Sequence, residues 1–92
     1  MTLNEFKKIL TEIRKLQSGL LTPNIKNLEV SDKLDLLLFL VPDQGEAARK
    51  FRDNLCTNLI ESSQNSSDGL KRLYHTFVQI GMNKEALKIL DL

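Results

Sequence analysis

The feature that most constrains the fold is a run of six apolar residues, from Leu36 to Val41, which ends at Pro42. The run has no polar stripe, so it must either be enclosed on most sides or cover an exposed binding patch. It is far shorter than the roughly 20 residues that a membrane-spanning helix needs. Leucine outnumbers β-branched residues in it and Ser31 offers an N-cap before it. The pattern therefore favours a helix from a cap at Ser31 to Val41, with a buried strand as the competing interpretation. We expect a central helix that the proline terminates.

Apolar residues on both sides of this run recur at intervals of three and four, which is the spacing of amphipathic helices. The first such segment predicts a helix over residues 3–18 that Gly19 ends. The other segments predict a short helix after Thr22-Pro23, a helix over about 44–61, one from a cap at Ser67 to Ile80 that Gly81 ends, and a last helix capped by Asn83 in which Ala86, Leu87 and Leu90 point inward.

Local polar residues indicate where some helices start and where a loop lies. Thr2 with Glu5, and Asp43 with Glu46, have the spacing of capping boxes, which satisfy free N-terminal amides. The stretch 61–67 is polar and has no apolar side chain to bury. It therefore predicts the longest and most mobile loop of the chain.

Six short helices and no strand pattern predict an all-α fold, a compact six-helix antiparallel bundle. The 92 residues suffice for one domain and not for two. A composition of 41% hydrophobic and 27% charged residues is that of a globular domain and argues against a disordered tail or a membrane protein. The start lacks the pattern of a signal peptide, which predicts a cytoplasmic protein, with the nucleus as the alternative. The end at Leu92, just past the last helix, suggests the N-terminal domain of a longer protein.

The residue types that catalytic and metal sites need are scarce. Cys56 is the only cysteine and His75 the only histidine, which excludes an internal disulfide and a multi-thiolate metal site. Cys56 lies on the shoulder of an apolar face and is interpreted as a small buried residue. His75 is expected at the surface or at its boundary rather than as a ligand or general base. The sequence contains neither a glycine-rich phosphate loop nor a calcium-binding loop. Neither enzymatic activity nor a cofactor is therefore predicted.

Leucine-rich segments of the chain are similar to parts of two helical families. The segment from Leu34 to Pro42, with Phe51 and Leu55 after it, resembles the middle of caspase-recruitment domains. The segment 70–90 looks like the last two helices of death-effector domains, although residues 82–87 replace the Arg-x-Asp-Leu motif of that family. The chain thus resembles the death-fold superfamily, with the subfamily open. This resemblance implies a non-catalytic adaptor domain that docks onto related domains in apoptotic or innate-immune signalling.

Charge is unevenly distributed along the chain, although the formal net charge is only +1. Residues 1–28 carry five basic and two acidic side chains, residues 29–46 carry one basic and five acidic, and residues 47–92 carry seven basic and five acidic. The basic residues of the first helix lie away from its apolar line. The candidate partner-binding residues are Lys7, Lys8, Arg14 and Lys15 on one face and Asp32, Asp35, Asp43 and Glu46 on another.

A basic and an acidic face on different helices allow head-to-tail docking with a second copy or with another helical domain of the same superfamily. The plain alternative is that mixed charges only keep a small domain soluble. A second hypothesis is an unrelated helical scaffold or regulatory domain that binds a partner helix through apolar surface. A tetratricopeptide-like scaffold fits less well, because no repeat of roughly 34 residues is visible. Neither a nucleic acid nor a membrane is an expected partner, since the apolar run offers no polar side chain to base edges and the net charge is small.

Overall fold

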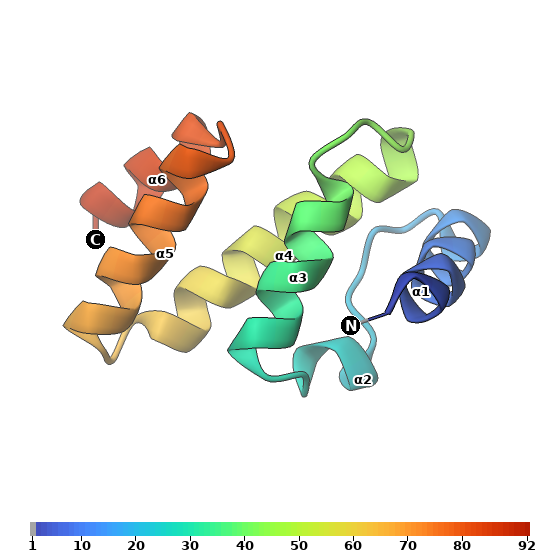
Figure 1. Cartoon of the computed structure of the whole chain (residues 1–92), viewed down its shortest axis with the longest axis horizontal. Coiled ribbons are helices and arrows are strands. Elements are labelled where there is room, and N and C mark those ends of the chain that lie inside the picture. Colours follow the sequence, from blue (N-terminus) through green and yellow to red (C-terminus); the bar gives the residue numbers. More distant parts are fainter. Residues whose placement is uncertain (1) are drawn as a thin grey trace. The chain divides into compact units, whose positions relative to one another are not determined.

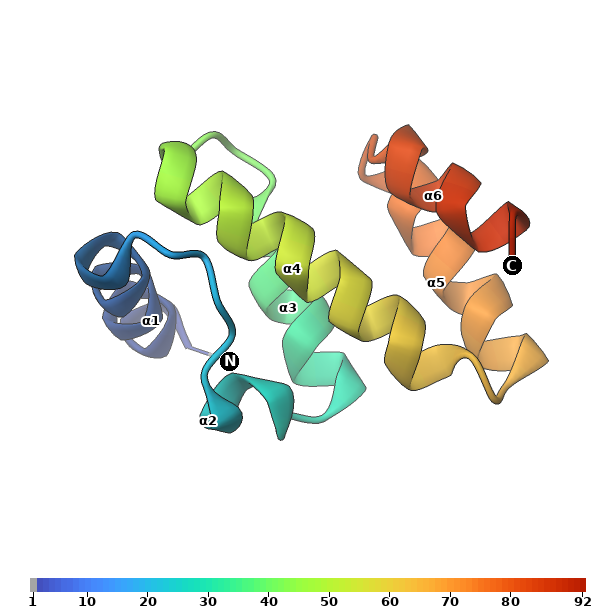
Figure 2. The same ribbon diagram turned by 180° about the vertical axis from the view of Figure 1, so that it is seen from behind.

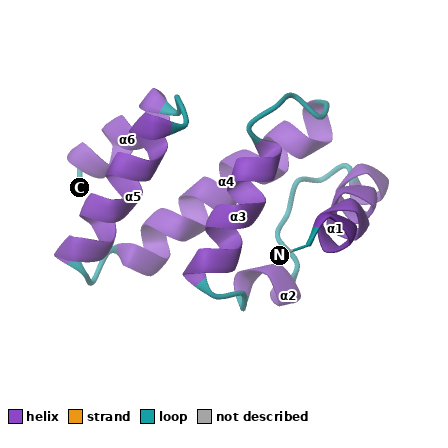
Figure 3. Cartoon of the chain, viewed as in Figure 1, coloured by secondary structure: helices purple, strands orange, loops and turns teal. Residues whose placement is uncertain are grey.

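The computed structural model describes residues 2–92, and these residues form six α-helices and no strand (Figures 1 and 3). The prediction of an all-helical chain is confirmed. The helices are α1 (Leu3–Leu16), α2 (Pro23–Lys26), α3 (Val30–Leu40), α4 (Glu46–Ser63), α5 (Ser67–Gln79) and α6 (Asn83–Leu90).

The helices fall into two compact units, and the division between them lies inside a helix. The first unit, Met1–Leu55, contains α1, α2, α3 and the first part of α4. The second unit, Cys56–Leu92, contains the rest of α4 together with α5 and α6. Helix α4 therefore contributes side chains to both units.

In the first unit, α1 presents a line of buried apolar residues at helical spacing. Phe6 of this line stacks on Phe39 of α3, with 4.7 Å between the ring centroids and 22° between the ring planes. Removing a side chain of this size from water stabilises a fold by about 1.5 to 3 kcal/mol. The buried apolar side chains of this unit are Phe6, Leu10, Ile13, Ile25, Leu36, Leu37, Leu40, Ala48, Phe51 and Leu55.

The start of α1 agrees with the sequence and its end does not. Thr2 caps the helix by accepting a 3.2 Å hydrogen bond from the Glu5 N–H. The helix ends at Leu16, two residues earlier than predicted, because Gln17 adopts the left-handed conformation with φ +54. The predicted terminator, Gly19, lies in the connection to α2 instead.

Gly19 is held against α4 at a point where only glycine fits. Its φ is +69, and a Cβ at this position would lie 2.5 Å from the Cβ of Lys50. Its carbonyl accepts a 2.6 Å hydrogen bond from Nδ2 of Asn54. Because glycine has no Cβ, it allows both the left-handed backbone and the close approach. The connection between α1 and α2 is therefore fixed on α4.

Helix α3 is buried along one side only. Leu36, Leu37 and Leu40 are almost fully buried, whereas Leu38 is 50% exposed. The prediction of a helix enclosed on most sides is therefore wrong for its outer side. Six consecutive residues wind through more than one turn, so they cannot all face one core.

In the second unit, α5 and α6 pack against each other and lie side by side in both views (Figures 1 and 2). Gly81 ends α5 in the left-handed conformation with φ +83, as the sequence predicts. The N–H of Met82 donates to the carbonyl of Phe77 at 2.8 Å, and the N–H of Gly81 donates to that of Val78 at 3.1 Å. These two bonds form a Schellman turn, which satisfies the last carbonyls of α5.

The predicted loop over 61–67 is mostly helix. Helix α4 continues to Ser63, which is buried, and only residues 64–66 separate α4 from α5. Extending a formed helix by a residue adds one hydrogen bond without a new nucleus, so a short polar end is tolerated. Ser66, and not Ser67, caps α5 by accepting a 3.0 Å hydrogen bond from the N–H of Gly69.

Two further helix starts differ from the sequence prediction by one or two residues. Helix α3 begins at Val30, because the N–H of Lys33 already bonds to the carbonyl of Glu29 at 3.0 Å; Ser31 is therefore inside the first turn. Helix α6 begins at Asn83 itself, with Met82 in the cap position and no side-chain cap. In both cases the backbone supplies the first helical bond one residue or more before the polar side chain.

The inner face of α6 is also different from the prediction. Ala86 is buried as expected, but Leu87 and Leu90 are 58% and 61% exposed. Ile89 is the second buried residue of this helix. Ala86 and Ile89 are three residues apart and therefore lie on one side of a helix that is only two turns long.

Candidate functional site

The four candidate basic residues all lie on α1 and are all exposed. Within residues 2–92 no ion pair joins any of them to an acidic side chain. Lys7 and Arg14 are seven residues apart, close to two turns, so they lie on one line along the helix, and Lys8 and Lys15 lie on a second line. Glu12 follows Lys8 by four residues and neighbours the second line only. The Lys7–Arg14 line is therefore the more strongly positive part of the helix surface.

The four candidate acidic residues lie on α3 and around the start of α4, and each interacts within its own chain. Oδ1 of Asp43 is 4.0 Å from Nε of Arg49, and Oε1 of Glu46 is 3.7 Å from Nζ of Lys50. Asp32 and Asp35 also interact with groups of the chain. Asp43 accepts a 2.9 Å hydrogen bond from the N–H of Gly45 as well, so it orders the turn before α4 rather than capping the helix directly.

An open hollow between the end of α1 and the start of α4 brings a basic and an acidic candidate together. Arg14 and Glu46 both line this hollow, which has a volume of about 400 Å³. Lys50 lines it too. The basic and acidic candidates were expected on separate faces, and at this hollow the two faces adjoin. Opposite charges around one hollow lower the net charge that this part of the surface offers to a partner.

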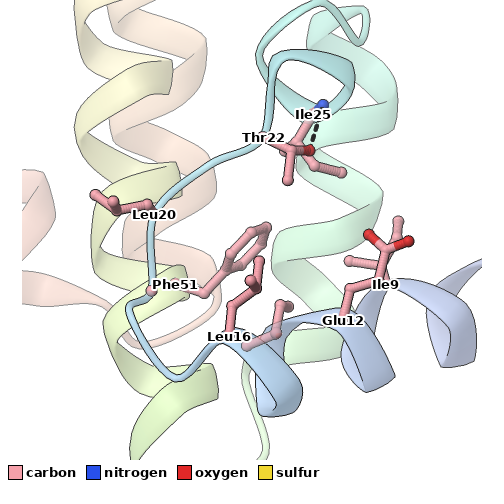
Figure 4. A pocket seen from close by; sticks show the side chains of 9 residues that line it. Ile9, Glu12, Leu16, Leu20, Thr22, Ile25 and Phe51 are labelled. Carbon is pink, nitrogen blue, oxygen red and sulfur yellow. Dashed lines mark hydrogen bonds between the residues drawn. The ribbon is translucent and has the colours of Figure 1, made fainter.

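A small apolar pocket lies between α1, the connection to α2, and α4 (Figure 4). Leu16, Ile25 and Phe51 are among the side chains around it, and the N–H of Ile25 donates a 3.4 Å hydrogen bond to Oγ1 of Thr22 at its edge. The space open to the centre of a water molecule is about 10 Å³, which is about what a single water needs. The pocket is therefore a packing seam of the first unit and not a site for an organic ligand.

The residues with catalytic potential are dispersed. Cys56 is buried and His75 is exposed, as the sequence predicts. His75 packs edge-on against the ring of Tyr74, with 5.7 Å between the centroids. In the described part of the chain, no group of three or more His, Cys, Asp or Glu side chains is placed to hold a metal ion. None of the helices formed by residues 2–92 has the length and apolar character to cross a membrane.

Sequence reasoning missed that Lys33, the only base in the segment 29–46, is buried. The side chain is 4% exposed and lies on the inner side of α3. A signal for this was present, because Lys33 precedes Leu36 by three residues and Leu37 by four and thus shares their side of a helix. The exposed surface of this segment is therefore more acidic than its count of charges indicates.

No protein-family model, no curated protein and no solved structure matches the chain.

Proposed function

We propose that this chain is a non-catalytic protein-interaction module that docks onto copies of itself or onto related helical domains. The observation that carries the proposal is the asymmetry of its charges: the bases of α1 are exposed and have no ion pair within residues 2–92, whereas the acidic candidates interact within the chain. Exposed unpaired bases on a short helix attract an acidic surface and direct the orientation in which it docks.

The proposed arrangement of the six helices is the antiparallel bundle of the death-fold superfamily. The number and order of the helices support it, as does the similarity of the segment 34–42 to the middle of caspase-recruitment domains. Helix α2, with four residues, is shorter than that family leads one to expect. The cytoplasmic location and the role in apoptotic or innate-immune signalling are proposed on this resemblance alone.

The proposed mechanism is an exchange of weak ion pairs. Asp43 and Glu46 are both exposed, and their contacts with Arg49 and Lys50 are long. Exposed pairs of this kind contribute only about 0.2 to 1 kcal/mol each, so a partner's bases can replace them at small cost. The Lys7–Arg14 line of one copy would then meet the acidic residues around the start of α4 of the next. Because every contact is weak, assembly requires several contacts at once.

Sedimentation velocity of the purified chain over a range of concentrations, at low and at high salt, tests this proposal. We expect the sedimentation coefficient to rise with concentration at low salt and to fall back to that of a monomer at high salt, because salt screens exposed charges. Lys7→Glu with Arg14→Glu is expected to abolish the rise.

The matched control is Lys71→Glu with Arg72→Glu on α5, which removes two exposed bases and changes the net charge by the same amount. This control is expected to assemble like the unchanged chain, and circular dichroism should show that both variants remain helical. Equal loss of assembly in both variants would mean that net charge, and not the α1 line, governs association. Assembly that persists in the α1 variant would contradict the proposal directly.

A further inference from the structure

The outer side of α3 carries an exposed apolar stripe. Val30, Leu38 and Val41 are 47%, 50% and 36% exposed, and Leu34 between them is half-buried. At 100° per residue these four side chains fall within about 80° of one another on the helix. Single exposed apolar residues are common on protein surfaces, but here four apolar residues that are exposed or half-buried lie on one side of one helix.

Acidic residues border this stripe. Asp35 is exposed next to it on α3. Asp43 is exposed just after the helix ends, where it also lies 4.0 Å from Nε of Arg49. Glu29 is exposed at the start of the helix. Lys33, the one base of the segment, is buried and so adds no exposed positive charge beside the stripe. An apolar stripe with a negative border complements a helix that has apolar residues on one side and basic residues beside them.

We propose that the outer side of α3 binds a basic amphipathic helix of another protein. A second copy of this chain does not supply such a helix. Its α1 has the bases, but the apolar line of that helix is buried, and its exposed Leu3 and Leu16 lie on opposite flanks. Binding at α3 is therefore heterotypic. Its apolar stripe is distinct from the surface onto which α1 docks, although Asp43 borders both.

The test uses a fluorescein-labelled synthetic peptide of roughly 18 residues, with leucines at heptad spacing and lysines beside them. Fluorescence anisotropy measures its binding to the full chain. We expect binding by the unchanged chain and at least about a tenfold higher Kd for Leu38→Glu, because an anchor in the middle of the stripe is lost. The matched control, Leu90→Glu, replaces an exposed leucine on α6 and should leave the Kd unchanged.

Two altered peptides separate the apolar from the electrostatic contribution. A peptide with serines in place of the leucines keeps the charge and should not bind. A peptide with glutamates in place of the lysines keeps the apolar residues and should bind at least about tenfold more weakly, since it meets an acidic border. Binding of either altered peptide as tight as that of the original would overturn the proposal, as would a normal Kd for Leu38→Glu. The variant Lys7→Glu with Arg14→Glu should bind the peptide normally, so a failure of self-assembly is distinguishable from a failure at α3.

Discussion

At the scale of single residues, Gly19 is constrained both by its backbone conformation and by its neighbours. Its left-handed backbone and its contact with Lys50 of α4 each exclude a side chain, for independent reasons. Gly81 has only the first of these constraints, because nothing lies within 4 Å of a Cβ built on it. Comparing the two positions separates the cost of the backbone conformation from the cost of the clash.

Gly19→Ala is expected to lower the free energy of unfolding by about 2 to 5 kcal/mol, from left-handed strain of about 1 to 2 and overpacking of about 1 to 3. Gly81→Ala should lower the free energy of unfolding only by the cost of the left-handed strain, about 1 to 2 kcal/mol. Urea denaturation followed by circular dichroism measures both. Equal losses at the two positions would show that the connection moves away from α4 without cost.

At the scale of secondary-structure elements, the start of α5 distinguishes two neighbouring serines. Ser66→Ala removes the side chain that accepts from the N–H of Gly69 and is expected to cost about 1 kcal/mol. Ser67→Ala changes the first helical residue and should stay within about 0.5 kcal/mol of the unchanged chain. Thermal denaturation of both variants gives the comparison. A larger loss at Ser67 would instead agree with the cap expected from the sequence alone.

The helices themselves could be predicted because their apolar residues repeat with a helical period, as in α1 and α5. Their ends could not, because local hydrogen bonds decide them. Gln17 takes the left-handed conformation two residues before the glycine that the sequence suggests, and the helix continues through Ser62 and Ser63 where polarity suggests a loop. Sequence patterns indicate which side chains of a helix are buried. They say little about which backbone carbonyl accepts the last hydrogen bond of that helix.

For the candidate site, the exposure of the α1 bases follows from spacing alone, and the structure agrees. The placement of Arg14 and Glu46 around one hollow does not follow from spacing, because the two residues lie 32 positions apart and come together only through packing. The exposed side of α3 could likewise not be predicted, because the run from Leu36 to Val41 has no polar residue to mark which side faces solvent. Tertiary contacts, and not local pattern, decide both features.

At the scale of the whole molecule, two features predict the form of assembly. The bases of α1 are exposed and lie seven residues apart, whereas the acidic candidates interact within the chain. Head-to-tail docking uses two different surfaces, so it continues from copy to copy and does not stop at a dimer. The sedimentation coefficient of the unchanged chain should therefore keep rising with concentration rather than level off.

A mixing experiment tests this arrangement with two neutralised variants. Lys7→Gln with Arg14→Gln keeps only the acidic surface, and Asp43→Asn with Glu46→Gln keeps only the basic one. Each alone should be a monomer, and an equimolar mixture should give a dimer that grows no further, because one complementary pair of surfaces remains. Neutral replacements are used so that no swapped ion pair can form. A mixture that stays monomeric, or a single variant that still dimerises, would refute head-to-tail docking.

The contact between Gly19 and α4 also predicts which residues related proteins keep. A chain that shares this fold can replace Gly19 only if the connection moves away from α4, because a Cβ there would lie 2.5 Å from the Cβ of Lys50 and 3.0 Å from its backbone carbonyl carbon, and the hydrogen bond from Asn54 would then be lost. Distant relatives should therefore keep a glycine shortly before the Thr-Pro of α2, together with a short side-chain donor about 35 residues later, long after the rest of the sequence has diverged.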